Sequence, residues 1–300
     1  MTPRRDLRVA YSGEPGAFAE DAVLAAFVDP HPVPLPGFRH VFEAVTSGCA
    51  DPAAPPDSAD IAAGVFPIEN LVNGTVRENY DLLLEHDLVV VGEVIVPVRL
   101  CLAALPGQSI DQIERVYSHI QALGQAESFL RTRPWTLLTT YNTAGAAKLI
   151  VDRDERSAAA VLSPRAAALF GLEILAQDIQ QMADNRTRFL IVARPGPSSR
   201  ATVRPALRGA GSGPAPMRTT MVLAVRNEPG SLYRCLGVFA RAGINLSKLE
   251  SRPSRDRAWE YVFWVDLDAD EAQASAAADA LAPETSMLRI LGTYARSAGG

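Results

Sequence analysis

One short stretch of this 300-residue chain places three polar side chains at the start of an apolar run. Asn185, Thr187 and Arg188 precede residues 189–193, which are apolar and partly β-branched. An amide, a hydroxyl and a guanidinium can together bind a carboxylate and donate a hydrogen bond to a nearby oxygen. We therefore take these three residues as the first candidates for a functional site, and expect the hydroxyl and the guanidinium to lie side by side.

Further polar residues occur where other predicted strands end or helices begin. Glu69 and Asn70 follow the strand expected at 61–66. Ser118, His119 and Gln121 lie at the end of the strand expected at 115–118, and Thr143 and Ser163 lie at two helix starts. Ligands of α/β proteins bind beyond the carboxyl ends of strands, next to helix N-termini. Helix capping is an equally good explanation, by Asn142 or Thr143 at one helix start and by Ser163 at the other, and His119 is an alternative candidate for a general base.

The elements that must position these residues alternate between strand and helix. We expect strands at 7–11, 61–66, 115–118, 137–141, 158–162, 173–176 and 187–193, and helices at 17–27, 40–47, 121–131, 144–151 and 164–170. The apolar run 88–102, broken by Pro97, is too long for one strand and predicts a crossover between two lobes. The last strand is expected to return to the first lobe, which makes a cleft between two α/β lobes.

The remaining segments are predicted to be connections and a small C-terminal domain. The Pro-rich segments 29–37 and 51–58 are expected to be loops, and 195–216 a linker. Within this linker, the Gly-rich segment 209–213 does not follow a strand, so we reject a dinucleotide-binding loop there. After it, strands at 219–225, 244–253, 259–266 and 287–294 and helices at 232–242 and 270–281 give the order βαββαβ of a ferredoxin-like unit.

Composition excludes several classes of protein. The formal net charge of −5 and the pI near 5.5 argue against a nucleic-acid partner. The sequence shows no signal-peptide pattern and no membrane-spanning run, and its three scattered cysteines are typical of reduced cytoplasmic proteins. With four histidines, none at ligand spacing, we expect no metal site, and no cofactor motif is recognisable.

In order and spacing, the candidate segments resemble those of the prephenate dehydratase family. The resemblance is carried by residues 11–18, 67–70 with 74–76, 118–123, 143–144 and 185–189, and residues 229–232 and 249–253 resemble the two recognition segments of the ACT domain. It implies a catalytic α/β domain of the two-lobed, type II periplasmic-binding-protein-like fold over 1–195. Lobe 1 would comprise about 1–98 and 180–195, lobe 2 about 99–179, followed by a linker at 196–217 and an α+β ACT domain at 218–298.

The resemblance also implies a reaction and roles for individual residues. The reaction is the decarboxylating dehydration of prephenate, or of an analogue such as arogenate, without a cofactor. Thr187 would donate to the departing hydroxyl or position its donor, and Arg188 would pair with a carboxylate. Asn70 and Gln121 would orient the substrate, and Glu69 would hold the loop or tune polarity. The substrate-binding wall would comprise Ala17, Leu71, Ser118, Thr143, Ser163, Asn185 and Phe189.

Several positions depart from the family pattern, which leaves alternatives open. Glu14, Ala17, Ala19, Leu71, Ile120 and Gln181 replace residues that the family usually has there, and several of them exchange a hydroxyl for an apolar group. One alternative is a decarboxylase whose product keeps its hydroxyl. Another is an amino-acid sensor without catalytic activity.

The ACT resemblance implies regulation by phenylalanine or a related amino acid at an interface between paired ACT domains, in a homodimer or homotetramer. The implied effector residues are Gly230, Ser231, Leu232, Asn245, Leu246, Glu250, Ser251, Arg252 and Pro253. Gly230 and Leu232 would let the amino acid approach the backbone, while Asn245 and Leu246 would meet its polar end. A plain helix start at Gly230 and a plain turn at Asn245 are the simpler interpretations.

Overall fold

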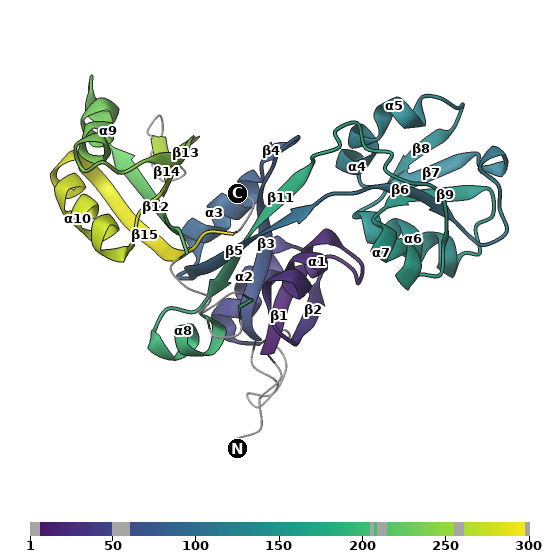
Figure 1. The fold of residues 1–300 in the computed structure, drawn as a ribbon, viewed down its shortest axis with the longest axis horizontal. Coiled ribbons are helices and arrows are strands. Elements are labelled where there is room, and N and C mark those ends of the chain that lie inside the picture. The colour runs from purple at the N-terminus through teal and green to yellow at the C-terminus, as the bar shows by residue number, and fades with distance from the viewer. Residues whose placement is uncertain (1–6, 50–60, 205–206, 209–214, 255–260, 298–300) are drawn as a thin grey trace, which may run out of the picture. The chain divides into compact units, whose positions relative to one another are not determined.

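The structure is a computed structural model that describes residues 7–49, 61–204, 207–208, 215–254 and 261–297 (Figure 1). The predictions at 51–58 and 209–213, and the start of the strand expected at 259, lie outside these residues. The chain divides into two compact units, one of Met1–Asp87 with Val94–Ile191 and one of Leu88–Glu93 with Val192–Gly300. The segment 88–93 thus groups with the C-terminal part of the chain.

The first lobe is built on a six-stranded sheet of order β2-β1-β3-β11-β5, in which β4 pairs with β3. Its strands are β1 (Leu7–Ser12), β2 (Pro30–Leu35), β3 (Ile61–Asn70), β4 (Gly74–Thr75), β5 (Val89–Pro97) and β11 (Arg186–Ala193). Its helices are α1 (Phe18–Ala26), α2 (Phe38–Ser47) and α3 (Arg77–Glu85). As predicted, β11 returns to this sheet from the second lobe and lies between β3 and β5.

One connection predicted in this lobe is in fact a strand. The Pro-rich segment around residue 33 forms β2, which pairs in parallel with β1 at the edge of the sheet. Pro30, Pro32 and Pro34 alternate, so the residues between them keep the N–H groups that an edge strand needs toward its single neighbour. The prediction was wrong because proline was taken as evidence against a strand, without regard to this alternation.

The second lobe is built on a five-stranded sheet of order β10-β6-β9-β7-β8. Its strands are β6 (Cys101–Ala104), β7 (Arg115–Ser118), β8 (Thr136–Thr139), β9 (Ala158–Leu162) and β10 (Glu173–Ala176), and its helices are η1 (Ile110–Gln112), α4 (Ile120–Gln125), α5 (Glu127–Leu130), α6 (Thr143–Asp152) and α7 (Pro164–Leu169). One long helix was predicted where α4 and α5 occur. Successive residues of β9 enter two different core clusters, which explains its uninterrupted apolar sequence.

The chain passes between the two lobes twice, as the run 88–102 predicted. It leaves the first sheet at the end of β5 and returns at the start of β11. The two passages are hydrogen bonded to each other: the Val98 N–H donates to the Asn185 carbonyl oxygen at 2.8 Å, and the Ile179 N–H donates to that of Leu100 at 3.0 Å. Asn185 therefore sits where the chain re-enters the first lobe.

The C-terminal unit has the predicted βαββαβ order. It comprises β12 (Met217–Val225), α9 (Ser231–Arg241), β13 (Leu246–Pro253), β14 (Tyr261–Leu267), α10 (Glu271–Leu281), η3 (Ala282–Glu284) and β15 (Thr285–Ala295). The sheet has the order β13-β14-β12-β15, and every pair in it is antiparallel. A core cluster that includes Leu223, Phe239, Val265 and Leu281 joins the two helices to one face of the sheet.

The segment predicted as a linker contains a helix, α8 (Pro197–Val203). Proline suits the first position of a helix, because its missing N–H would have no partner there. Val203 is fully buried, and Arg204 donates a hydrogen bond to the Thr293 carbonyl oxygen at 2.7 Å. Composition alone could not show that this short helix is stabilised by contacts with the C-terminal sheet.

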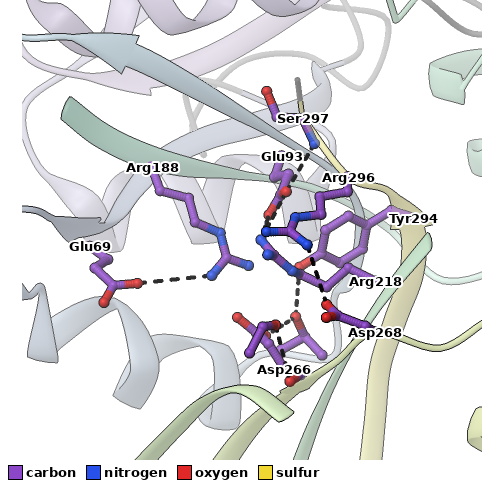
Figure 2. Close-up of polar contacts among 11 residues, drawn as sticks. Glu69, Glu93, Arg188, Arg218, Asp266, Asp268, Tyr294, Arg296 and Ser297 are labelled. Carbon is purple, nitrogen blue, oxygen red and sulfur yellow. Dashed lines mark hydrogen bonds and ion pairs between the residues drawn. The ribbon is translucent and has the colours of Figure 1, made fainter. Parts of the chain in front are cut away.

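The C-terminal sheet also contacts the segment 88–93 of β5. An added Cβ at Gly292 would lie 2.0 Å from the Val90 carbonyl oxygen, so only glycine permits this approach. The Arg218 guanidinium contacts both carboxylate oxygens of Glu93, at 2.9 and 2.7 Å (Figure 2). The two side chains are 6% and 0% exposed, so this is a buried ion pair.

Candidate active site

Asn70 is the centre of the polar group at the junction of β3 and β11. Its Nδ2 lies 2.9 Å from Asn185 Oδ1, 2.9 Å from Thr187 Oγ1 and 3.1 Å from the Arg186 carbonyl oxygen. Its Oδ1 accepts the N–H groups of Val72 and Asn73 at 3.0 and 2.9 Å. These two backbone donors fix the orientation of the amide, because only an oxygen can face them.

This orientation determines what Thr187 can do. Asn70 Nδ2 can only donate, so Thr187 Oγ1 accepts. Within the described part of the chain, no acceptor is found for the hydroxyl hydrogen of Thr187. Thr187 is 9% exposed, so this hydrogen points into a largely buried space. The site therefore presents an oriented hydroxyl donor.

Asn185 provides a second donor beside it. Its Oδ1 accepts from Asn70, whereas its buried Nδ2 has no hydrogen-bond partner among the described residues. A buried amide nitrogen without a partner costs free energy, on the order of 1–3 kcal/mol. A ligand oxygen that accepted from both Asn185 and Thr187 would remove this cost.

We predicted that the Arg188 and Thr187 side chains lie side by side, and this prediction was wrong. Successive side chains of a strand point to opposite faces of the sheet, and Asn70 and Thr187 meet on one face, while Glu69 and Arg188 meet on the other. The Arg188 Nη1 lies 3.9 Å from the Glu69 Oε2 (Figure 2). The prediction treated neighbours in sequence as neighbours in space and overlooked this alternation.

Glu69 and Asn70 also differ from the prediction in their backbone. They are the last two residues of β3, not the first two after it, and they pair with Thr75 and Gly74 of β4. The strand continues through Pro67, and its last two residues pair with β4, a partner that the sequence did not reveal. Both side chains nevertheless lie at the carboxyl end of β3, where a ligand was expected.

The second lobe brings its candidates to one edge of its sheet. Because β7, β8 and β9 are parallel, Ser118, Thr143 and Ser163 all follow strands that end at the same edge. The Ser118 hydroxyl, however, is fully buried and donates to the Val161 carbonyl oxygen at 2.5 Å. Ser163 caps α7, as one of its two interpretations held, accepting the Ala166 N–H at 3.0 Å.

The cap of α6 is Asn142, one of the two caps that the sequence suggested, and the cap of α4 is His119, two residues before Gln121. Asn142, not Thr143, caps α6 and accepts the Gly145 N–H at 2.5 Å, which leaves Thr143 half-buried as the first helical residue. His119 caps α4: its Nδ1 accepts the Gln121 N–H at 3.4 Å, and burial lowers the pKa of its imidazole. The Gln121 side chain is exposed.

The apolar residues among the predicted wall and the replaced positions divide into exposed and buried ones. Leu71 and Ile120 are each 62% exposed, which is unusual for large apolar side chains. The backbone of Leu71 is held by a hydrogen bond from its N–H to the Arg186 carbonyl oxygen at 3.0 Å. The Asn70 side chain donates to the same oxygen. Ala17 and Phe189 are buried.

Sequence reasoning missed a set of charged residues that joins the two lobes. Arg165 of α7 donates to Glu20 and to Asp21 of α1. Burial raises the pKa of Asp21, and the charge of Arg165 opposes this shift. The only sequence signal would have been two acidic residues in the first turn of α1 and an arginine in the first turn of α7, which by itself is unremarkable.

In the described part of the chain, no cluster of three or more His, Cys, Asp and Glu side chains has the arrangement of a metal site. None of the helices in that part is long and apolar enough to cross a membrane.

The candidate effector residues fall at two ends of the C-terminal sheet. Gly230, with φ of 83°, precedes α9, and the side chain of Ser231 accepts from Arg234 at 3.2 Å. Because β13 and β12 both pair antiparallel with β14, they run in the same direction, so Pro253 lies at the end of the sheet where α9 begins. Asn245 and Leu246 lie at the opposite end.

Within one chain, Gly230 and Asn245 thus lie at opposite ends of the sheet. The Asn245 side chain donates to Asp268 Oδ2 at 2.7 Å. The recognition segment that contains Glu250, Ser251 and Arg252 is part of β13, the edge strand of the sheet. Leu232 itself is half-buried in the first turn of α9.

Both parts of the chain match known protein families. The prephenate dehydratase family model matches residues 9–197, and the ACT domain model matches residues 219–282. Arogenate dehydratase 2 of Petunia hybrida is 38% identical over 98% of this chain and 73% of its own length.

Two solved structures are similar over nearly the whole chain, each with a TM-score of 0.79 and 29% identity. One is described as GqqA, a novel type of quorum quenching acylase. The similarity to it covers 97% of this chain and 98% of that protein. The other is the prephenate dehydratase of Arthrobacter aurescens in complex with L-Phe, of which 90% is covered by 97% of this chain. The chain belongs to the prephenate dehydratase family of lyases and carries an ACT domain at its C-terminal end.

Proposed function

We propose that this protein catalyses the decarboxylating dehydration of a cyclohexadienyl dicarboxylate, prephenate or arogenate, with Thr187 as the donor to the departing hydroxyl. The observation that carries the proposal is the oriented hydrogen bond from Asn70 to Thr187, which leaves the Thr187 hydrogen available for a substrate oxygen. The family membership supports the reaction class, and the similarity to both arogenate and prephenate dehydratases supports the two substrates.

In the proposed reaction two bonds of the substrate break together. The ring carboxylate leaves as CO2, and the electron pair of its C–C bond enters the ring as the C–O bond to the hydroxyl breaks. The departing oxygen takes one proton from solvent and leaves as water, and the ring becomes aromatic. Negative charge therefore develops on the departing oxygen, where the donors of Thr187 and Asn185 would stabilise it.

Hydrogen bonding, not full proton transfer, is the role that suits Thr187. An aliphatic hydroxyl is a weak acid, so it contributes by lying in the right place before the bond breaks. Removing one such preoriented donor lowers kcat by about 100- to 1000-fold in well-studied sites. Asn70 acts through Thr187 and Asn185 and is in this sense a positioning residue.

Arg188, which lies beside Glu69, is proposed to pair with a substrate carboxylate. The separation of 3.9 Å between Arg188 Nη1 and Glu69 Oε2 is at the limit of an ion pair, so a substrate carboxylate could replace this contact. Gln121, whose side chain is exposed at the start of α4, is proposed to orient the substrate from the second lobe.

Identification of the product tests the proposed reaction. The protein would be incubated in parallel with prephenate and with arogenate, and the products followed by absorbance and mass spectrometry. We expect phenylpyruvate or phenylalanine, with loss of both CO2 and water. A product that has lost CO2 but retains its hydroxyl would favour the non-aromatising decarboxylase. Absence of turnover with both, together with tight binding of phenylalanine, would favour an amino-acid sensor.

We further propose that phenylalanine regulates the enzyme at an interface between two ACT domains. The edge strand β13 is available for antiparallel pairing with its copy in a second chain. Such pairing would bring Asn245 and Leu246 of one chain to the end of the sheet where Gly230 and Pro253 of the other lie. This composite arrangement accounts for the separation of the two candidate sets within one chain.

Mixed dimers test this composite site. Gly230→Val blocks the backbone approach at one end, and Asn245→Ala removes the amide at the other. Each variant alone should lose phenylalanine binding by calorimetry, whereas a mixture of the two should regain binding, because half the sites of a mixed dimer contain neither substitution. Sedimentation should show a dimer; a monomer with full phenylalanine binding would refute the proposal.

The proposed compartment is the cytoplasm. All three cysteines are free thiols, and Cys101 and Cys235 are buried. Unpaired buried thiols are typical of proteins in reducing surroundings. Localisation of a tagged full-length chain by cell fractionation tests this proposal.

A further inference from the structure

The two lobes of the catalytic domain contact each other at the N-termini of two helices. Helix α1 follows β1 in the first lobe, and α7 follows β9 in the second. Arg165 Nη2 donates to Glu20 Oε2, and Arg165 Nε donates to Asp21 Oδ1. One guanidinium therefore bridges two carboxylates of the opposite lobe.

The Glu20 carboxylate also binds the turn that leads into α1. Its Oε2 accepts the Gly16 N–H at 2.7 Å, so Arg165, Glu20 and Gly16 form a continuous chain of contacts. The Ser163 hydroxyl lies 3.4 Å from the Gly16 carbonyl oxygen, to which it can donate from the second lobe. Both peptide groups flanking Gly16 are thus held by side chains.

The backbone packs closely at the same place. Gly16 has φ of +91°, and an added Cβ would lie 3.0 Å from the Ala166 Cβ and 3.1 Å from its Cα. Ala166 is 1% exposed. The absence of a side chain at Gly16 is therefore what allows α7 to approach this turn.

Arg165 is not free to serve as the carboxylate-binding residue of the site. Its single positive charge is opposed by two carboxylates, Glu20 and Asp21, whose side chains are 15% and 21% exposed. Partly buried bidentate contacts of arginine are more specific than exposed pairs. If Arg165 were removed, both partly buried carboxylates of α1 would lose their counter-charge, and separation of the lobes would be favoured because it exposes them to water.

We propose that Arg165, with Glu20 and Asp21, forms an interlobe latch that holds the two lobes in the arrangement that binds substrate, and that Arg165 is a positioning residue for the reaction. This inference rests on the proposed dehydratase function. The latch adjoins Ala17 and Ser163, two of the residues expected to line the substrate site. Substrate would bind to latched molecules, and the fraction of latched molecules would set the apparent affinity.

Steady-state kinetics give the first test, with matched variants. Arg165→Gln removes the charge, and Arg165→Lys keeps it but cannot bridge both carboxylates. Arg131→Gln is the control, because Arg131 lies in the same lobe and pairs with Glu127 inside that lobe. We expect KM to rise about tenfold for Arg165→Gln with kcat changed less than about twofold, since saturating substrate restores the latched state. Arg165→Lys should be intermediate and Arg131→Gln unchanged.

Salt provides a readout that a purely structural role would not give. Salt screens the pairing of substrate with Arg188 in both proteins, so both KM values should rise with ionic strength, but that of the wild type should rise more steeply because its interlobe ion pairs are screened as well. Equal salt dependence of the two KM values would overturn the proposal. A fall in kcat with unchanged KM would overturn it as well.

A distance measurement tests the latch independently of turnover. Spin labels would be placed on exposed positions of the two lobes, at Glu43→Cys and Lys148→Cys, in a Cys49→Ser background. We expect one narrow interlobe distance in this labelled protein and a broader, longer distribution when Arg165→Gln is added. Identical distributions would refute the latch, even if the protein is an active dehydratase. A shift in distance without turnover of either substrate would instead support the latch and refute the proposed function.

Discussion

Replacing Asn70 with aspartate would reverse the polarity of the hydrogen bonds at the site with almost no change in shape. The new carboxylate would still accept the N–H groups of Val72 and Asn73 through one oxygen. Its other oxygen, however, could only accept, so the Thr187 hydroxyl would donate to it across the present 2.9 Å separation. The hydrogen that we assign to the substrate oxygen would then be bound to the enzyme.

The size of the effect follows from this competing bond. A hydrogen bond to a charged group contributes about 1.5–3 kcal/mol. Since about 1.4 kcal/mol corresponds to a factor of ten in rate, breaking it before reaction would lower kcat by about 10- to 100-fold. The negative charge would also repel a dicarboxylate substrate. We therefore expect Asn70→Asp to lower kcat by about 100-fold and to raise KM.

The assay is initial-rate kinetics of Asn70→Asp beside Asn73→Asp. The exposed Asn73 contacts Asn70 through its backbone N–H, so the second variant adds the same charge nearby without changing the Thr187 contact. Protonation would give the introduced carboxyl a donor again, so kcat of Asn70→Asp should rise as the pH falls from about 8 to about 5. Equal activity of the two variants, with parallel pH profiles, would refute the proposed role of Asn70.

Three further predictions concern stability. Glu93→Leu should destabilise the protein toward urea by about 3–5 kcal/mol by leaving the buried Arg218 charge unpaired, and adding Arg218→Met should recover most of this loss. Gly292→Ala would place a Cβ 2.0 Å from the Val90 carbonyl oxygen, so hydrogen exchange should accelerate in the strand that contains Val90. Burial lowers the pKa of His119 from its ordinary 6.5. The stability that the neutral imidazole contributes is therefore fully present above about pH 6.5 and is lost as the pH falls through the lowered pKa. His119→Gln should reduce this acid-dependent loss in thermal melts; an unchanged slope would contradict the assignment.

The fold could largely be predicted from local patterns. The apolar run of β9, the broken run at Pro97 and the alternation of strands and helices depend on residues close in sequence. Strand β2 and helix α8 could not be predicted in this way. The first depends on its position at a sheet edge, and the second is followed by Arg204, whose hydrogen bond to Thr293 joins segments far apart in sequence.

The site was predictable in its residue types but not in its geometry. The sequence identified Asn70, Asn185 and Thr187, and they are in contact. It could not show that the Asn70 amide is held by two backbone donors, because those bonds form only when the chain turns after β3. It also could not show the contact between Arg165 and Glu20, which are separated by 145 residues.

The central claim is that the Thr187 hydroxyl, presented by Asn70, assists the departure of the substrate hydroxyl. It is tested most directly by the single-turnover rate of Thr187→Val beside that of Thr187→Ser, with substrate binding measured separately. Valine keeps the shape without the hydroxyl, and serine keeps the hydroxyl. We predict that Thr187→Val loses about 100- to 1000-fold in rate while binding substrate normally, and that Thr187→Ser stays within about tenfold of the wild type. A Thr187→Val enzyme as fast as Thr187→Ser would contradict the account.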